Sequence, residues 1–280
     1  SYSIPRTFYV SPAGHDHWSG LNSEPTADGL DGPFGSIHRA QEALRELKAA
    51  GHLQGPATVY IRGGNYGLPE TLVFTHADSG TETSPITFRA YPNEKPVLSG
   101  GRQIRGWRQL DEGPLWVADV PLGWSFNQLF VNGKRATRAR IPNTGYLRSA
   151  GPLPGISNPQ AERDNPAAKR GFRVKPEDLQ LWPDMTDAIF VVYHSWATSL
   201  HHVDTVNTAA NTVTFLQPAH WPMGYWEREQ RYHVENLFSA LDSPGEWYLD
   251  EGESLLYYWP REDEQMTEAV VIAPILRQLV

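Results

Sequence analysis

The chain has 280 residues, 24 basic and 32 acidic side chains, a net charge of −8 and no cysteine. This length suits one large domain or two ordinary ones. The missing cysteines exclude disulfide scaffolds, cysteine-based zinc sites and cysteine nucleophiles, and the acidic excess argues against duplex DNA or an anionic membrane as a partner. With 10 Trp, 12 Tyr and 10 Phe beside 24 Gly and 23 Pro, the composition indicates a turn-rich, aromatic-rich β protein.

The N-terminal segment predicts a strand over residues 7–10, a turn-rich loop over 11–35 and a helix over 36–50. Ser36 is a favourable N-cap, and Gly51 provides a C-terminal stop. Apolar side chains recur at helical spacing on one face, namely at Ile37, Ala40, Leu44 and Leu47. That face must cover other apolar groups, so we expect this helix to cap the fold.

Short strands separated by turns follow the helix. The pattern predicts strands over residues 58–62, 71–74, 85–91 and 96–98. Such rungs suit either a sandwich or a parallel β-solenoid. A helix placed before the first rungs favours the solenoid, because an open solenoid end needs a cap.

From about residue 107 to residue 260 the rung spacing disappears. Hairpin-like pieces are predicted at residues 129–134, 188–193, 211–216 and 246–259, with a long loop over 151–175. We therefore expect an antiparallel β domain inserted into the solenoid. Residues 268–280 are predicted to form a strand that returns to the solenoid, whose coil either further chain or a second chain would complete.

Several segments resemble one family. At the N-terminus these are residues 8–16 (FYVSPAGHD), 32–40 (GPFGSIHRA), 59–66 (VYIRGGNY) and 84–91 (SPITFRAY); later ones are 128–140 (QLFVNGKRATRAR), 232–236 (YHVEN) and 244–250 (PGEWYLD). They resemble the right-handed parallel β-helix glycoside hydrolases that include α-L-fucosidases and xylanases, and more distantly the β-helix β-xylosidases.

The resemblance implies an all-β fold in three parts. These are an N-terminal cap with the first coils of a right-handed parallel β-helix (residues 1–106), an inserted antiparallel β-sandwich-like domain (107–262) and a return to the β-helix (263–280). In such enzymes the acidic catalytic pair sits on later coils. We therefore expect the catalytic carboxylates to lie beyond residue 280, and no catalytic residue is assigned.

Large aromatic residues on a Pro/Gly loop form the best substrate-contact candidate. Trp221, Tyr225 and Trp226 are poorly placed for a core, and sugar rings stack their C–H faces on aromatic planes. His194 and Trp196, where an apolar strand closes, are added as candidate substrate contacts, and so is Glu227. Packing is the alternative for each aromatic residue, and it is the role expected for the strand tryptophans Trp116, Trp182, Trp247 and Trp259.

The other polar clusters have simpler explanations. Glu227 and Glu229 are expected to share a strand face, but surface acids are mostly solvated. His15 and His17, or His201, His202 and Asp204, lack any established zinc spacing, so no metal is predicted. Three arginines could form an anion site or ordinary salt bridges, with the second and third on one strand face: Arg135, Arg138 and Arg140. No cofactor or nucleotide motif is present.

The function expected is the N-terminal portion of a glycoside hydrolase that cleaves fucoside- or xyloside-type bonds of plant or microbial saccharides, in a secreted or periplasmic setting. The partner is then a carbohydrate, with no nucleic acid and no membrane. One alternative is a polysaccharide lyase on a β-helix, which would need a basic groove. Another is a non-catalytic carbohydrate-binding or assembly module completed by a second chain.

Overall fold

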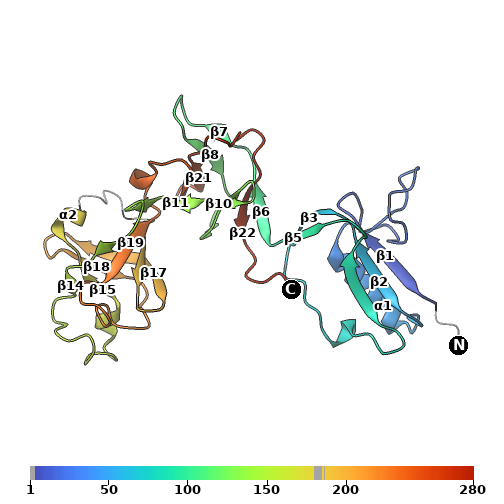
Figure 1. Cartoon of the computed structure of the whole chain (residues 1–280), viewed down its shortest axis with the longest axis horizontal. Coiled ribbons are helices and arrows are strands. Elements are labelled where there is room, and N and C mark those ends of the chain that lie inside the picture. Colours follow the sequence, from blue (N-terminus) through green and yellow to red (C-terminus); the bar gives the residue numbers. More distant parts are fainter. Residues whose placement is uncertain (1–3, 180–184, 186) are drawn as a thin grey trace. The chain divides into compact units, whose positions relative to one another are not determined.

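The computed structural model describes residues 4–179, 185 and 187–280, and the chain divides into two compact units (Figure 1). Unit 1 comprises the described residues up to Arg102 together with Pro274–Val280, and unit 2 is Gln103–Ala273. The chain thus passes from unit 1 to unit 2 and back. The sequence predicted boundaries after residues 106 and 262, whereas unit 2 begins at Gln103 and ends at Ala273.

Strands dominate both units, in keeping with the expected all-β class. In unit 1 the elements are β1 (Arg6–Val10), α1 (Ile37–Ala49), β2 (Ala57–Ile61), β3 (Gly64–Gly67), the 3₁₀ helix η1 (His76–Asp78), β4 (Ile86–Ala90) and β5 (Pro96–Ser99). None of the helices among the described residues has the length and apolar character needed to cross a membrane.

The strands of unit 1 pair in parallel. β2 lies between β1 and β4, and β3 pairs with β5, all in parallel register. Side chains alternate between the two faces of a strand, so Phe8 and Val59 point into the core while Tyr9 and Tyr60 stack on the other face at 5.9 Å. Parallel in-register rungs of this kind are what a solenoid requires.

The predicted helix is confirmed with its caps. Ser36 accepts a hydrogen bond from the backbone N–H of Arg39 at 3.1 Å, which satisfies one of the free N–H groups of the first turn. Gly51, at φ 71°, follows the helix in the left-handed conformation that terminates it. Ile37, Ala40 and Leu44 are buried against Phe8 and neighbouring residues in the core of unit 1.

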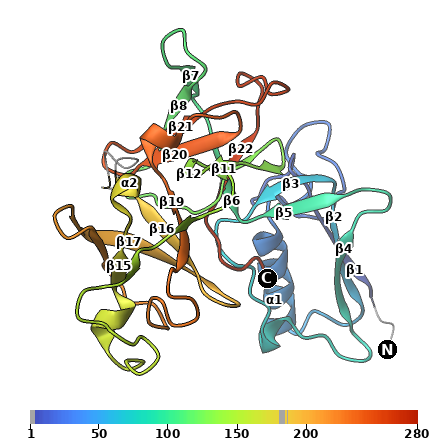
Figure 2. The same ribbon diagram turned by 60° about the vertical axis from the view of Figure 1, so that its left-hand side comes forward.

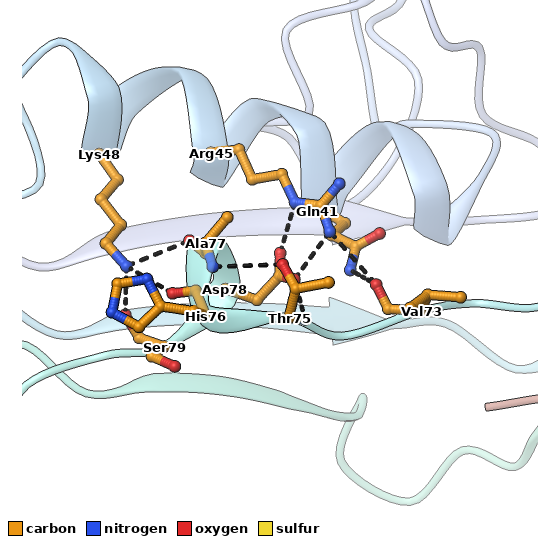
Figure 3. Close-up of polar contacts among 9 residues, drawn as sticks. All are labelled: Gln41, Arg45, Lys48, Val73, Thr75, His76, Ala77, Asp78 and Ser79. Carbon is orange, nitrogen blue, oxygen red and sulfur yellow. Dashed lines mark hydrogen bonds and ion pairs between the residues drawn. The ribbon is translucent and has the colours of Figure 1, made fainter.

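The strand predicted over residues 71–74 is wrong. Side chains of α1 occupy the backbone groups that a neighbouring strand would need (Figure 3). The Val73 carbonyl accepts hydrogen bonds from Gln41 Nε2 at 2.9 Å and Arg45 Nη2 at 3.2 Å, and the Leu72 N–H donates to the carbonyl of Leu279 at 2.9 Å. The segment is therefore fixed as a coil.

The next turn is held by two cations of the same helix. Arg45 donates to both carboxylate oxygens of Asp78 at 2.7 Å, and this ion pair holds the pKa of Asp78 below its usual value. Lys48 Nζ donates to three carbonyls, those of His76, Ala77 and Ser79 (Figure 3). Asp78 also accepts from the Thr75 N–H at 2.7 Å, which completes a capping box around η1.

Unit 2 is built from short strands in three sheets (Figure 2). Its first strands are β6 (Gly101–Ile104), β7 (Arg108–Gln109), β8 (Trp116–Asp119), β9 (Phe130–Val131), β10 (Lys134–Arg135), β11 (Thr137–Arg138), β12 (Arg140–Ile141), β13 (Leu147–Arg148) and β14 (Gly151–Pro152). The remaining elements are η2 (Pro166–Lys169), β15 (Gly171–Arg173), α2 (Pro176–Leu179), β16 (Ile189–Tyr193), β17 (Thr198–Asn207), β18 (Thr212–Phe215), β19 (Arg231–Glu235), η3 (Phe238–Ala240), β20 (Glu246–Asp250), β21 (Leu255–Tyr258) and β22 (Val271–Pro274).

The sheets of unit 2 are mainly antiparallel. The largest runs β12-β19-β16-β17-β18-β15-β14, the second β11-β20-β21-β8-β7 and the third β10-β9-β22-β6. Two apolar clusters of described residues lie within them, one around Phe172, Phe190 and Tyr232 and one around Leu129 and Trp247. The predicted hairpins β9–β10 and β20–β21 are confirmed by antiparallel pairing.

Two other expectations for this part of the chain need correction. Residues 151–175 are not a plain loop, since β14 and β15 pair there and η2 lies between them. The strand predicted over residues 268–280 is limited to β22. Beyond it the chain runs back into unit 1 as a coil, where the carbonyls of Gln278 and Leu279 accept hydrogen bonds from Thr71 and Leu72.

Asp78→Asn should destabilise the 73–79 segment by about 1–3 kcal/mol, because it removes a charge-assisted bidentate contact and weakens the cap. Hydrogen exchange read by mass spectrometry should show faster exchange in peptides that cover these residues. Glu46→Gln on the same helix is the control, because its pair with Arg39 is solvent-exposed and should contribute little. Unchanged exchange in Asp78→Asn would contradict this account.

Candidate functional site

Four aromatic side chains from two loops of unit 2 meet at one end of the largest sheet. Trp196 lies in the turn between β16 and β17, while Trp221, Tyr225 and Trp226 lie in the loop between β18 and β19. The end of β16 and the start of β19 are paired neighbours, as shown by the partners Val192 and Tyr232. Both loops therefore leave the sheet at the same end of its strands.

The rings of these residues contact one another directly. Ring centroids lie 4.8 Å apart for Trp196 and Trp226, 4.7 Å for Tyr225 and Trp226, 5.0 Å for Trp221 and Tyr225, and 5.5 Å for Trp221 and Trp226. These are the spacings of favourable tilted and edge-on aromatic pairs. We call the four residues the aromatic platform.

The platform keeps much of its apolar surface in water. Trp196 is 72% exposed and Trp226 is 40% exposed, while Trp221 and Tyr225 are half-buried. Large aromatic residues normally gain stability by burial, so an exposed cluster of them makes this surface a candidate site for ligand binding. All four residues are substrate-contact candidates from the sequence, and the structure brings them together.

Backbone and side-chain contacts fix the platform loop. Gly224, at φ 81°, donates its N–H to Oε1 of the fully buried Gln230 at 2.8 Å, and Gln230 Nε2 donates to the Tyr193 carbonyl. Gln230 thus ties the platform loop to the end of β16. The geometry at Gly224 favours glycine, because a side chain is strained at positive φ.

A third loop supports the platform and was missed from the sequence. Arg163 places its guanidinium 4.5 Å from the centre of the Trp221 ring, and Gln160 Nε2 donates to the Tyr225 carbonyl at 3.1 Å. A cation over an indole face is attracted by the ring quadrupole. No short-range pattern links residues 160 and 163 to residues 221 and 225, so the sequence carried no signal of this contact.

Glu227 is held by two arginines beside the platform. Arg231 Nε donates to its Oε1 at 2.5 Å, and Arg148 Nη1 to its Oε2 at 3.1 Å. The expected strand that would align Glu227 and Glu229 is wrong, since both residues lie in the loop before β19. Both carboxylate oxygens of Glu227 are engaged by cations, so a ligand would meet an Arg–Glu–Arg group with one excess positive charge.

His194 is buried behind the turn that carries Trp196. Its Nε2 lies 2.8 Å from the Ser199 hydroxyl, which is also 2.7 Å from His201 Nε2. Burial lowers the pKa of His194, and it lowers the pKa of His201 to about 4. Both imidazoles are therefore neutral near pH 7, and the Ser199 hydroxyl links them by accepting from one and donating to the other.

The histidines and acids suggested as possible ligands do not converge on a metal site. Within the described residues, no group of three His, Asp or Glu side chains has metal-binding geometry. His201 instead lies flat against Phe215 at 4.6 Å, as part of the packing of the sheet. Trp247 is a core residue, 1% exposed, as expected, whereas Trp182 lies outside the described residues.

A buried polar chain on β16 and β19 was also missed. The Tyr193 hydroxyl lies 2.9 Å from His233 Nδ1, and His233 Nε2 lies 2.8 Å from Glu235 Oε1. Glu235 Oε2 faces Arg138 Nη1 at 3.7 Å. The spacing of two between His233 and Glu235, on one strand face, is the signal that could have revealed it.

Comparison with known proteins points to carbohydrate enzymes. The model of the family described as the GH141 insertion domain matches residues 113–261. A solved structure described as a glycoside hydrolase aligns with a TM-score of 0.77 and 27% identity, over 98% of this chain and 47% of that chain.

Two curated relatives match parts of the chain. A pectate lyase PEL9 from Emericella nidulans is 30% identical over 150 residues, which are 50% of this chain and 32% of that protein. An uncharacterised protein YwoF from Bacillus subtilis is 41% identical over 92 residues, 33% of this chain and 15% of that protein. The chain therefore spans a third or less of the curated relatives it matches.

Stability should fall as pH drops from about 6.5 to about 4, the ordinary and the folded pKa of His201. In this window the unfolded chain takes up a proton that the folded chain excludes, so the free energy of unfolding decreases by up to about 3 kcal/mol. Chemical denaturation at several pH values should show a smaller loss in His201→Gln. The control is His202→Gln, an exposed neighbour; an equal loss in wild type and His201→Gln would disprove the assignment.

Proposed function

Because the chain belongs to the family described as the GH141 insertion domain, we propose that it is part of a carbohydrate-active glycoside hydrolase and that the aromatic platform of unit 2 binds its saccharide. The observation that carries this proposal is the exposure of Trp196 and Trp226 in direct ring contact. A pyranose presents a face of C–H groups to the electron-rich face of an indole, a contact with little cost in ordering because the platform is preformed.

The polar groups around the platform suit sugar hydroxyls. The ion pairs of Glu227 with Arg148 and Arg231 offer donors and acceptors side by side at its edge. Charged groups fixed in this way can hydrogen-bond hydroxyls without rearranging. An apolar surface flanked by such groups is the usual composition of a ligand site.

We further propose that unit 1 forms the first coils of a right-handed parallel β-helix, capped by α1, and that unit 2 is a β-sandwich-like insertion. The parallel pairing of β1, β2 and β4 and of β3 with β5 supports the solenoid. The passage of the chain from unit 1 to unit 2 and back supports the insertion.

The catalytic carboxylates are proposed to lie outside these 280 residues. A glycoside hydrolase needs two carboxylates across the scissile bond, about 5–5.5 Å apart for retention or about 6.5–9.5 Å for inversion. The chain covers 47% of the solved glycoside hydrolase, which leaves room for such a pair elsewhere in a longer protein. The substrate would be a fucoside- or xyloside-type plant or microbial saccharide, and the protein would act in a secreted or periplasmic setting.

A second candidate function is that of a polysaccharide lyase. It is favoured by the similarity of half of the chain to the pectate lyase of Emericella nidulans. A lyase removes a proton beside a uronate carboxylate and so needs positive charge near its substrate. The two functions differ in their products, because only a lyase leaves an unsaturated uronate.

Trp226→Ala should weaken binding of neutral xylo-oligosaccharides by about two- to tenfold, since one lost aromatic contact costs roughly 0.5–1.5 kcal/mol. Isothermal titration calorimetry gives the affinity, and circular dichroism checks the fold. Phe238→Ala is the matched control, because Phe238 is 49% exposed but lies outside the platform. Equal affinities for all three proteins would show that the platform does not bind these sugars.

Residues 1–280 alone should not hydrolyse aryl fucosides, aryl xylosides or xylan, because we place the acid pair elsewhere. Chromogenic assays test hydrolysis, and absorbance at about 235 nm on polygalacturonate tests the unsaturated product of a lyase. Turnover by this chain that one internal carboxylate substitution abolishes, with Glu227→Gln as the first to try, would refute the placement of the catalytic pair.

A further inference from the structure

A polar cavity of about 250 Å³ lies in unit 2 apart from the rings of the platform. Its walls come from the β9–β12 region and from β19 and β20, and they carry three arginines, one acid, one amide and one indole: Arg135, Arg138, Arg140, Glu235, Asn127 and Trp247. Three positive charges against one negative charge leave a cationic interior in a chain whose net charge is −8.

Arg138 is the buried centre of this cavity. Its side chain is 4% exposed, and its guanidinium lies 4.8 Å from the centre of the Trp247 ring. Nη2 donates to the Phe126 carbonyl at 2.9 Å and to Asn127 Oδ1 at 2.8 Å. These contacts fix the plane of the guanidinium.

The rest of the guanidinium lacks hydrogen-bond acceptors. Among the described residues, Arg138 Nε and Nη1 and Trp247 Nε1 are buried without a hydrogen-bond partner. All three atoms are donors, and a guanidinium never accepts. A buried donor without an acceptor is costly, so the two unsatisfied donors of Arg138, which lines the cavity, call for a ligand rich in acceptors.

The nearby acid does not fill this role. Glu235 Oε2 stays 3.7 Å from Arg138 Nη1, beyond hydrogen-bond distance, and Glu235 Oε1 is bonded to His233. The Glu235 carboxylate therefore balances one charge without satisfying the donors. The sequence allowed ordinary salt bridges or an anion site for these arginines. The ion pair of Arg138 with Glu235 lacks a hydrogen bond, which favours the anion site.

We propose that this cavity binds the carboxylate of an acidic saccharide, with Arg138 as the central donor and Arg135 at the exposed rim. A carboxylate supplies two oxygens and several lone pairs, which match unsatisfied guanidinium donors and the positive excess. That the ligand is a saccharide rests on the proposed function, whereas the preference for an anion rests on the cavity itself.

The test compares trigalacturonate with its fully methyl-esterified form, which keeps the sugar rings and removes the charge. Calorimetric titration of residues 1–280 should show about tenfold tighter binding of the acid, the range expected for a charge-assisted contact. The preference should shrink as salt is raised. Inorganic phosphate serves as a further probe, to separate a saccharide carboxylate from a free anion.

Two variants probe the cavity. Arg135→Gln changes an exposed rim residue and should retain the fold while reducing the acid preference at least threefold, and Arg138→Lys should abolish the preference, with thermal unfolding as a check on the fold. Arg108→Gln is the matched control, because this exposed arginine pairs with Asp119 away from the cavity. A reduced preference in Arg135→Gln, with the preference of Arg108→Gln unchanged, would support the proposal.

Other outcomes overturn it. Equal binding of the acid and the ester would show that the cavity does not bind the carboxylate. The same conclusion would follow if the acid preference were unchanged both in Arg135→Gln and in a folded Arg138→Lys. Binding of phosphate without binding of trigalacturonate would refute an acidic saccharide. If the acid test fails while Trp226→Ala still weakens neutral sugar binding, the proposed function stands without the cavity. If the acid preference is found while Trp226→Ala has no effect, the platform is refuted and the cavity is retained.

Discussion

The pairing of β22 with β9 and β6 is the constraint on which the two-unit organisation depends. The chain leaves unit 1 along β6 and returns along β22, and the two strands are neighbours in one sheet. Val271 pairs with Val131 opposite it, and Val271 and Ala273 are fully buried. Apolar burial combined with ladder hydrogen bonds fixes this return, and the C-terminal coil can then bond to residues 71 and 72 of unit 1.

In unit 2, the order of the strands in the largest sheet brings the residues of the candidate site together. β16 lies between β17 and β19, so the turn with Trp196 and the loop with Trp226 emerge side by side. Two of these strands, β16 and β19, carry the buried chain from Tyr193 through His233 to Glu235, which ends at the cationic cavity. The largest sheet therefore positions the aromatic platform at the ends of its strands and supplies Arg140 and Glu235 to the cavity, whose other walls come from the two smaller sheets.

Sequence patterns predicted those features whose causes are local. The helix after Ser36 was predicted because its cap, apolar stripe and Gly51 stop lie within one short segment. The strand expected over residues 71–74 failed because Gln41 and Arg45, about 30 residues earlier, bind its backbone. The aromatic residues of the platform could be named from their Pro/Gly context, but the support from Arg163 and the burial of Arg138 against Trp247 depend on contacts between distant segments.

The adjacency of β6 and β22 also links the stabilities of the two units. While unit 2 is folded, the two points where the chain leaves and re-enters unit 1 are held close together, because β6 and β22 are neighbouring strands about 4.8 Å apart. If unit 2 unfolds, the same connection becomes a flexible loop of about 170 residues, whose closure costs roughly 3 kcal/mol more than that of a tight turn. The docking of Pro274–Val280 onto unit 1 would be weakened by that amount. Loop-closure entropy therefore couples the stability of one unit to the folding of the other.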